Sequence, residues 1–338
     1  MLKAAVIGVG SMGHHHARIY REMSNVELVT VVDKNPETAS KVATRFQVPY
    51  YTDIDAMLNE CKPDLVSLAV PTSLHYSVGV KLMEQGIHVL IEKPIAKTLE
   101  EGARLIEVAE RNGVTLAIGH IERFNPAVME LQRRLAAGMA GRIYKIQTQR
   151  LSPYPPRIQD AGVVIDLASH DIDLLRYLMQ DEIVRVYGET HQSINTERED
   201  IFNGLMRFRS GAVGVLDVNW ITPTKMRTLT VTGARGMFVC NLLSQELMFY
   251  ENGDGSAQWD TLSILHGVSE GNVIGIRLRR HEPLAAELDD FVAAVREGRP
   301  PTVTGRDGLE TLYLATEFLR SGRTAEISVQ GEELVRVR

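Results

Sequence analysis

Two short motifs in this chain combine a lysine, aspartates and a histidine at spacings that suit proton transfer. The first, Glu92-Lys93-Pro94, follows the apolar run Ile87–Ile91, which predicts a strand. The carboxyl end of a strand in an open α/β sheet faces the ligand crevice, so Lys93 is expected beside a bound ligand. Pro94 is compatible with a cis peptide that fixes this turn. A surface Glu–Lys pair at a strand end is the competing interpretation.

The second motif lies on a helix predicted near Ile165–Met179. Asp166, His170 and Asp173 are at i, i+4 and i+7, so they are expected to share one helix face. Such a face is either a solvated surface or one wall of a polar pocket. In a pocket, His170 can accept a proton near neutral pH, because an ordinary histidine has a pKa of about 6.5. Lys93 can then stabilise negative charge that develops on an oxygen atom.

A glycine motif near the N-terminus predicts where a cofactor binds. The motif follows an apolar strand and precedes a helical pattern, which is the context required for binding a dinucleotide. The first glycine permits the tight turn, the second lets the backbone approach a pyrophosphate, and the third lets helix and strand pack closely. The residues concerned are Gly8, Gly10, Ser11, Met12 and Gly13.

Asp33 ends the second predicted strand, 20 residues after Gly13, at the spacing expected for an acid that binds the adenosine ribose. A 2′-phosphate beside this carboxylate would cost about 4 kcal/mol per pair of like charges near 4 Å. The sequence therefore favours NAD over NADP, although Lys34 could soften the repulsion. Glu92 and Lys93 are then expected near the nicotinamide. A turn residue at a strand end is the alternative for Asp33.

Histidines and cysteines give no metal or disulfide pattern. His14, His15 and His16 are consecutive and would point about 100° apart on a helix, so they cannot share one ion. Cys61 and Cys240 have no metal-ligand spacing and no disulfide framework, which indicates a reducing compartment. We therefore expect no bound metal and a cytoplasmic protein.

Two domains are expected to position these residues. Up to about residue 122, short apolar strands alternate with helical patterns, which predicts a Rossmann domain with a doubly wound parallel sheet at 1–122. From residue 123 to 338, consecutive strands between Ile183 and Tyr250 predict an α+β domain with an open, mostly antiparallel sheet. The stretch Ser256–His281 carries no clear pattern. The fold class is therefore α/β in the first domain and α+β in the second.

One strand of the second domain suggests how copies of the chain associate. In Ala212–Trp220 both alternating sets contain apolar residues, whereas an open antiparallel sheet usually leaves one face wet. An exposed apolar face is a typical association surface. A homodimer or homotetramer through the second sheet is expected.

Composition excludes several classes of protein. The 338 residues carry a formal net charge of -6, without the basic excess of a nucleic-acid binder. No apolar stretch is long enough for a transmembrane helix, and the N-terminal run is too short for a signal peptide. No nucleic-acid or membrane partner is therefore expected.

Together, these motifs resemble the Gfo/Idh/MocA oxidoreductase family over essentially the whole chain. The resemblance rests on the glycine motif, on Pro71-Thr72-Ser73-Leu74-His75, on Glu92-Lys93-Pro94 and on Asp166-x-x-x-His170. It implies that Lys93, Asp166 and His170 are the catalytic residues. It also implies that Pro71, Thr72 and His75 lie along the cofactor, and that the second domain holds an open sheet used in oligomers.

The resemblance implies NAD-dependent oxidation of a secondary alcohol of a sugar. His170 would take the hydroxyl proton, Lys93 would bind the same oxygen, and Asp166 would orient the substrate or tune the other two side chains. Lys93 as the base is the mechanistic alternative. A protein that senses NAD(H) without catalysis is the alternative of another class, although such a sensor needs none of the three residues.

Two segments, Gly119–Val128 and Arg157–Leu167, are similar to members of the family that oxidise the 3-hydroxyl of UDP-N-acetylglucosamine. A nucleotide sugar is therefore the expected substrate, with a free sugar or an inositol as the alternative. Its pyrophosphate would need local donors, for which Arg150 is a candidate. The alternative for His120–Phe124 is an interdomain hinge held by ion pairs. The expected substrate-binding residues are Arg123, Tyr154, Arg157 and Asp173.

Overall fold

A computed structural model describes residues 1–155, 161–194, 197–253 and 270–324. The first part of the chain forms a six-stranded sheet in the order β3-β2-β1-β4-β5-β6, with every neighbouring pair parallel. This is the strand order of a dinucleotide-binding fold, and it confirms the predicted Rossmann sheet. Its strands are β1 (Leu2–Ile7), β2 (Val26–Val32), β3 (Tyr50–Tyr51), β4 (Leu65–Leu68), β5 (His88–Glu92) and β6 (Leu116–Gly119).

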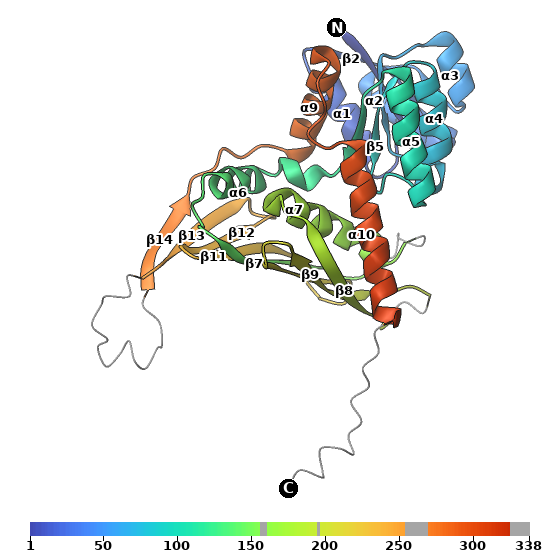
Figure 1. The fold of residues 1–338 in the computed structure, drawn as a ribbon. Helices are drawn as coiled ribbons and strands as arrows, with labels where there is room; N and C mark the ends of the chain where they lie inside the picture. Colours follow the sequence, from blue (N-terminus) through green and yellow to red (C-terminus); the bar gives the residue numbers. More distant parts are fainter. Residues whose placement is uncertain (156–160, 195–196, 254–269, 325–338) are drawn as a thin grey trace, which may run out of the picture.

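Helices cover both faces of this sheet (Figure 1). Capping residues explain where some of these helices begin and end. The Asn35 side chain caps α2 by accepting hydrogen bonds from the backbone of Glu37 and Thr38, with Pro36 in the first turn. Gly113 ends α5 in the left-handed conformation that glycine adopts easily. The helices are α1 (Gly13–Glu22), α2 (Pro36–Phe46), α3 (Ile54–Glu60), α4 (His75–Glu84) and α5 (Leu99–Asn112).

The second part of the chain forms an eight-stranded sheet in the order β14-β13-β12-β11-β7-β10-β9-β8. Only the β7–β10 pair is parallel, which confirms the mostly antiparallel prediction. β14 falls in the stretch where the sequence shows no clear pattern. The strands are β7 (Ile143–Leu151), β8 (Ile183–His191), β9 (Ile201–Phe208), β10 (Val213–Asn219), β11 (Met226–Gly233), β12 (Gly236–Asn241), β13 (Glu246–Asn252) and β14 (Glu270–Ile276).

Helices α6 (Pro126–Ala136) and α7 (Ser169–Met179) lie on one face of the second sheet, between it and the first domain (Figure 1). On β10, Leu216 and Val218 point to this inner face and are buried, whereas Val213 and Val215 on the outer face are half-buried. Within the described residues, no helix covers the outer face. The second sheet is therefore open, as the strand pattern predicts.

The last two helices return to the first domain. α9 (Pro283–Glu297) buries Leu288 and Phe291 in the same cluster as the first sheet and α1. The long helix α10 (Gly305–Thr324) packs against α5 near its start and against α7 and β8 farther along (Figure 1). The domain boundary placed between residues 122 and 123 stays a prediction, because the C-terminal helices contact both sheets.

Two local features differ from the sequence analysis. The helix expected near Ile165–Met179 begins as a π-helical turn, Val164–Ala168, before α7. The short elements β3 and α3 were not predicted, although Asp53 caps α3 through the backbone of Ala56. In the described part of the chain, no helix is both long and apolar enough to cross a membrane.

Candidate active site

The glycine loop between β1 and α1 has the geometry needed to receive a pyrophosphate. Gly8 has a φ of +83°, and a Cβ there would lie 2.6 Å from the Ala69 carbonyl oxygen. A Cβ at Gly13 would lie 1.8 Å from the Gly8 oxygen. A Cβ at Gly10 would meet nothing within 4 Å, so this backbone is open to an approaching ligand. The three glycines therefore match the roles predicted for them.

The start of α1 adds a site for negative charge. Ser11 and Met12 are exposed, and no side chain caps the helix at Met12, so ligand oxygens can reach the backbone N–H groups of the first turn. At the end of β2, Asp33 accepts hydrogen bonds from the backbone of Val9 (3.0 Å) and Asn35 (2.9 Å). A carboxylate has about four acceptor positions, so Asp33 keeps acceptors for a ribose diol. These residues fit a dinucleotide.

The segment after β4 carries Pro71, Thr72 and His75, which the family resemblance places along the cofactor. Pro71 is exposed and Thr72 is half-buried. The His75 ring is buried, and its two nitrogens lie 2.9 Å from the carbonyl oxygens of Pro94 and Val70. His75 therefore ties this segment to the turn that carries Lys93. Its contact with a cofactor stays a prediction.

The Glu92 side chain contacts a buried histidine of α1. The Nε2 atom of His16, which is fully buried, lies 3.0 Å from Glu92 Oε1. Burial raises the pKa of Glu92, but His16 and Lys93 together outweigh this effect, through hydrogen bonds and charge, and lower the pKa overall. His14 contacts the Gly10 carbonyl instead, at 2.7 Å. The rings of His14 and His15 pack together, with centroids 3.8 Å apart, whereas His16 points inward to Glu92.

Lys93 and Asp166, from different domains, meet at the carboxyl edge of the first sheet. Lys93 Nζ donates to the Asp166 carbonyl oxygen at 2.5 Å and to its Oδ1 at 3.1 Å. The Lys93–Pro94 peptide bond is cis. An ammonium group has three donors, so one N–H of Lys93 remains for a ligand oxygen.

His170 lies within electrostatic range of Lys93. Its Nδ1 atom is buried, with no hydrogen-bond partner in the part of the chain that the structure describes. Burial, and then the charges of Lys93 and Arg150, hold the pKa of His170 well below its ordinary value. The ordinary pKa assumed from the sequence is therefore wrong, and the imidazole is neutral at neutral pH. A neutral ring has one nitrogen that can accept a proton.

Asp173 does not join Lys93 and Asp166 on a shared face. The π-helical turn at Val164–Ala168 changes the helical phase between Asp166 and His170, so the expected i, i+4 geometry does not apply. Asp173 instead accepts two hydrogen bonds from Arg123, at 2.8 Å and 2.6 Å. Asp173 was predicted to contact substrate, but it forms an internal ion pair with Arg123 instead.

Arg123 is also placed differently from the prediction. Its Nη2 atom donates to Asp307 at 2.9 Å and its Nη1 atom to the Thr302 carbonyl at 3.2 Å, in addition to Asp173. The side chain is 5% exposed. Burial lowers the pKa of Arg123, but the adjacent carboxylates outweigh this and raise it. Arg123 therefore does not fit the predicted role in binding pyrophosphate, and its contacts are the ion pairs of the alternative interpretation.

A second buried ion cluster lies next to His170. Arg150 on β7 donates to Asp171 at 2.7 Å and to Glu122 at 2.9 Å. Arg227 on β11 pairs more distantly with the same Glu122 oxygen, at 3.5 Å. Sequence reasoning missed Arg227 and included Glu122 only within the segment His120–Phe124, since no motif marks contacts between residues so far apart in the chain.

His120 is a further site residue that the sequence analysis did not single out. It follows β6, is 2% exposed, and neither ring nitrogen has a hydrogen-bond partner in the described ranges. Burial lowers the pKa of His120, the charge of Asp173 raises it, and the charge of Arg123 lowers it further. Its neighbours place it between the catalytic pocket and the Arg123 cluster.

Two other predicted substrate residues lie near the loop before residue 161. The Tyr154 ring packs edge-on against Trp220, with centroids 6.0 Å apart. Arg157 lies outside the described residues. Both stay predictions for substrate binding.

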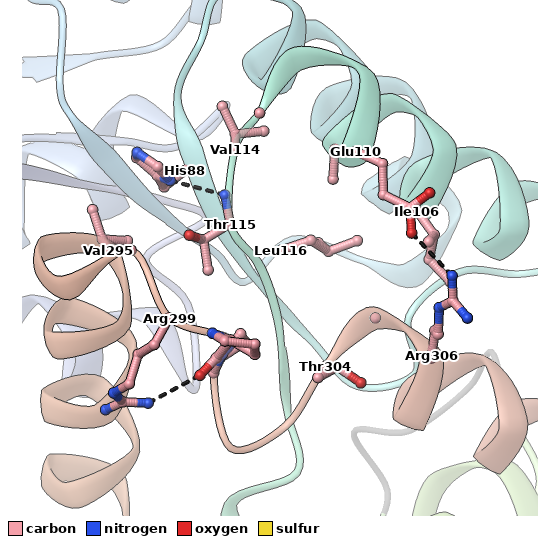
Figure 2. A pocket seen from close by; sticks show the side chains of 16 residues that line it. His88, Ile106, Glu110, Val114, Thr115, Leu116, Val295, Arg299, Thr304 and Arg306 are labelled. Carbon is pink, nitrogen blue, oxygen red and sulfur yellow. Dashed lines mark hydrogen bonds and ion pairs between the residues drawn. The ribbon is translucent and has the colours of Figure 1, made fainter.

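A separate cavity of about 470 Å³ lies at the opposite edge of the first sheet, where β5 and β6 begin (Figure 2). Its arginines are already engaged, Arg306 with Glu110 and Arg299 with a backbone carbonyl (Figure 2). Predicted site residues do not line it. Among the described residues, no group of three or more histidine, cysteine, aspartate or glutamate side chains could hold a metal ion.

Comparisons with known proteins agree with this geometry. Residues 2–120 match the model of an oxidoreductase family with an NAD-binding Rossmann fold. Residues 128–239 match the model of the GFO/IDH/MocA C-terminal domain.

Characterised relatives match over nearly the whole chain. UDP-N-acetylglucosamine 3-dehydrogenase from Acidithiobacillus ferrooxidans is 32% identical over 316 residues, or 94% of this chain and 96% of that protein. A solved structure of that enzyme aligns with a TM-score of 0.85 at 31% identity, covering 95% and 97% of the two chains. The scyllo-inositol 2-dehydrogenase from Bacillus subtilis is 28% identical over 345 residues, covering 97% of each chain. The chain is therefore an oxidoreductase of the GFO/IDH/MocA family, with an N-terminal NAD-binding Rossmann fold.

Proposed function

We propose that this protein oxidises a secondary hydroxyl of a nucleotide sugar, most specifically the 3-hydroxyl of UDP-N-acetylglucosamine. The contact of Lys93 Nζ with Asp166 Oδ1, at 3.1 Å beside a neutral His170, carries the proposal. It gives an alcohol oxygen both a proton acceptor and a positively charged donor. Similarity to the Acidithiobacillus enzyme supports the nucleotide-sugar substrate.

In this mechanism His170 and Lys93 act on the substrate oxygen, and Asp166 acts through Lys93. His170 accepts the hydroxyl proton as general base, and its lowered pKa keeps it neutral and able to do so. Lys93 uses its remaining N–H to stabilise negative charge on that oxygen. Asp166 positions the Lys93 ammonium through its carbonyl and carboxylate oxygens. Bound NAD supplies the acceptor for the hydride that leaves the carbinol carbon.

The substrate class is tested with a panel that contains UDP-N-acetylglucosamine, free N-acetylglucosamine and inositols, with NADH absorbance as the readout. Turnover of the nucleotide sugar supports the proposal. Turnover of free polyols alone would select the second candidate, which similarity to the inositol dehydrogenase favours. Tight NAD binding without any turnover would instead indicate a sensor.

Asp33 is expected to set the preference for NAD over NADP. In Asp33→Ala the repulsion of a 2′-phosphate disappears, and the ratio of the two dissociation constants should move toward one. Asp33→Asn keeps the shape and an acceptor for the Val9 N–H but lacks the charge, so it separates charge from loop support. Titration of both cofactors against the three proteins measures this. Equal binding of NADP and NAD by the unmodified protein contradicts the assignment.

The outer face of the second sheet is proposed to join copies of the chain into a dimer or tetramer. Leu205 on β9 is exposed there, and Val213 and Val215 on β10 are only half-buried. Leu205→Lys should weaken the assembly, because it places a charge in a face that would be buried. Light scattering at micromolar concentration measures the mass, and a monomeric unmodified protein would reject the proposal.

A further inference from the structure

Three arginines lie near His170 or His120, and they differ in how fully the protein neutralises their charge. Arg123 and Arg150 are almost fully buried, and each has close carboxylate partners. Arg227 differs, because 33% of its side chain is exposed and its ion pair with Glu122 Oε1 is 3.5 Å long. That oxygen already accepts a shorter hydrogen bond from Arg150, at 2.9 Å. Nη2 of Arg150 also has no hydrogen-bond partner among the described residues, but the Arg150 side chain is 2% exposed. Of these three guanidinium groups, Arg227 is therefore the one that a ligand can reach from solvent.

The position of Arg227 on its strand directs it toward the reaction centre. It lies opposite Arg150 across the β11–β7 ladder. Because alternate residues of a strand face the same side, it shares the inner face with the buried Leu229 and Val231. This is the face that α7, the helix of His170, covers.

Electrostatics agree with that placement. The charge of Arg227 contributes to lowering the pKa of His170, after the larger effects of burial and of the Lys93, Arg150 and His120 charges. Burial, and then Arg150, lowers the pKa of Arg227 itself, while Glu122, Asp171 and Asp166 oppose this. Arg227 is therefore within electrostatic range of His170 and Asp166, and a third of its side chain is exposed.

We propose that Arg227 binds the phosphate of the nucleotide-sugar substrate and so selects nucleotide sugars over free sugars. The inference rests on the proposed function. A guanidinium group matches a phosphate in planar shape and can donate two hydrogen bonds to it. A free sugar or inositol carries no negative charge at this place and would gain little from the arginine.

The test compares the unmodified protein with Arg227→Gln and Arg227→Lys, with UDP-N-acetylglucosamine as substrate and UDP as competitive inhibitor. Loss of a charged hydrogen bond should raise both the KM and the UDP inhibition constant by about 10- to 100-fold in Arg227→Gln. Arg227→Lys should lose less, and kcat should change less than KM. Arg104→Gln, which removes the same charge from the exposed surface of α5, is the matched control.

The outcomes separate this inference from the proposed function. If the unmodified protein oxidises the nucleotide sugar and Arg227→Gln keeps the KM and the UDP inhibition constant, only the inference fails. If UDP neither inhibits nor binds the unmodified protein and only free polyols are oxidised, the proposed substrate fails as well. Unchanged NAD affinity and thermal unfolding temperature in Arg227→Gln show that the fold is intact. An equal rise of KM for a free sugar would also overturn the inference.

Discussion

His170→Ala is expected to lower kcat by about 10²–10⁴-fold, the usual contribution of a positioned general base. Lys93→Ala should cause a comparable loss, because it removes the donor that stabilises the substrate oxygen. The double variant should lose much less than the product of the two effects, since the side chains act on one oxygen as a unit. Steady-state kinetics with the best substrate of the panel measure all three proteins. Binding of NAD, followed by calorimetry, should be little changed.

The pH dependence identifies the base. His170 must be neutral to accept a proton, and burial lowers its pKa. Activity of the unmodified protein should therefore rise with pH through a value below 6.5, the ordinary pKa of histidine, and be level by neutral pH. This acidic limb should vanish in His170→Ala. If the limb persists there and vanishes in Lys93→Ala, Lys93 is the base. The exposed His191 provides the matched control, and His191→Ala should keep both rate and profile.

The fold was largely predictable because its main signals are local. The glycines at 8 and 13 are required by the backbone of one turn, and segments of four to seven mostly apolar residues mark the buried parallel strands. On β10 the sequence shows apolar residues on both faces, and the structure shows that Leu216 and Val218 are the buried set. The π-helical turn at Val164–Ala168 carries no such signal, because its extra residue per turn leaves the composition of the segment unchanged.

The candidate site was predictable only where a motif marks it. Lys93, Asp166 and His170 stand in motifs, and the structure brings Lys93 and Asp166 into contact. Ion pairs depend on tertiary structure, and Arg123 finds partners 50 and 184 residues away. Sequence reasoning could identify Arg123 as a cation near the site, but not that carboxylates already neutralise it. For the same reason it missed Arg227, because the residue type does not show whether the side chain is exposed and can reach a ligand.

The buried Arg123–Asp173 pair leads to the second large expected effect, which is on stability. Asp173→Ala removes a carboxylate that is 1% exposed and leaves the Arg123 guanidinium buried with Asp307 as its remaining ion-pair partner. Breaking one side of a buried ion pair costs about 3–5 kcal/mol. Because Asp307 still pairs with Nη2 of Arg123, at 2.9 Å, we expect the lower end of this range, a loss of about 3 kcal/mol in the free energy of unfolding. Urea unfolding followed by circular dichroism measures it.

Two further variants distinguish an unpaired buried charge from a simple loss of contact. Replacing both partners, as in Arg123→Met with Asp173→Leu, should recover much of the stability, because a hydrophobic pair leaves no uncompensated charge. Arg104→Ala, which breaks an exposed pair with Glu107, should cost only about 0–1 kcal/mol. If Asp173→Ala costs no more than Arg104→Ala, the cluster does not stabilise the fold.

Since Arg123 follows β6 while Asp173 and Asp307 lie on α7 and α10, the same cluster holds the helix of His170 against the domain that carries Lys93. Asp173→Ala should therefore also lower kcat at temperatures where the protein remains folded.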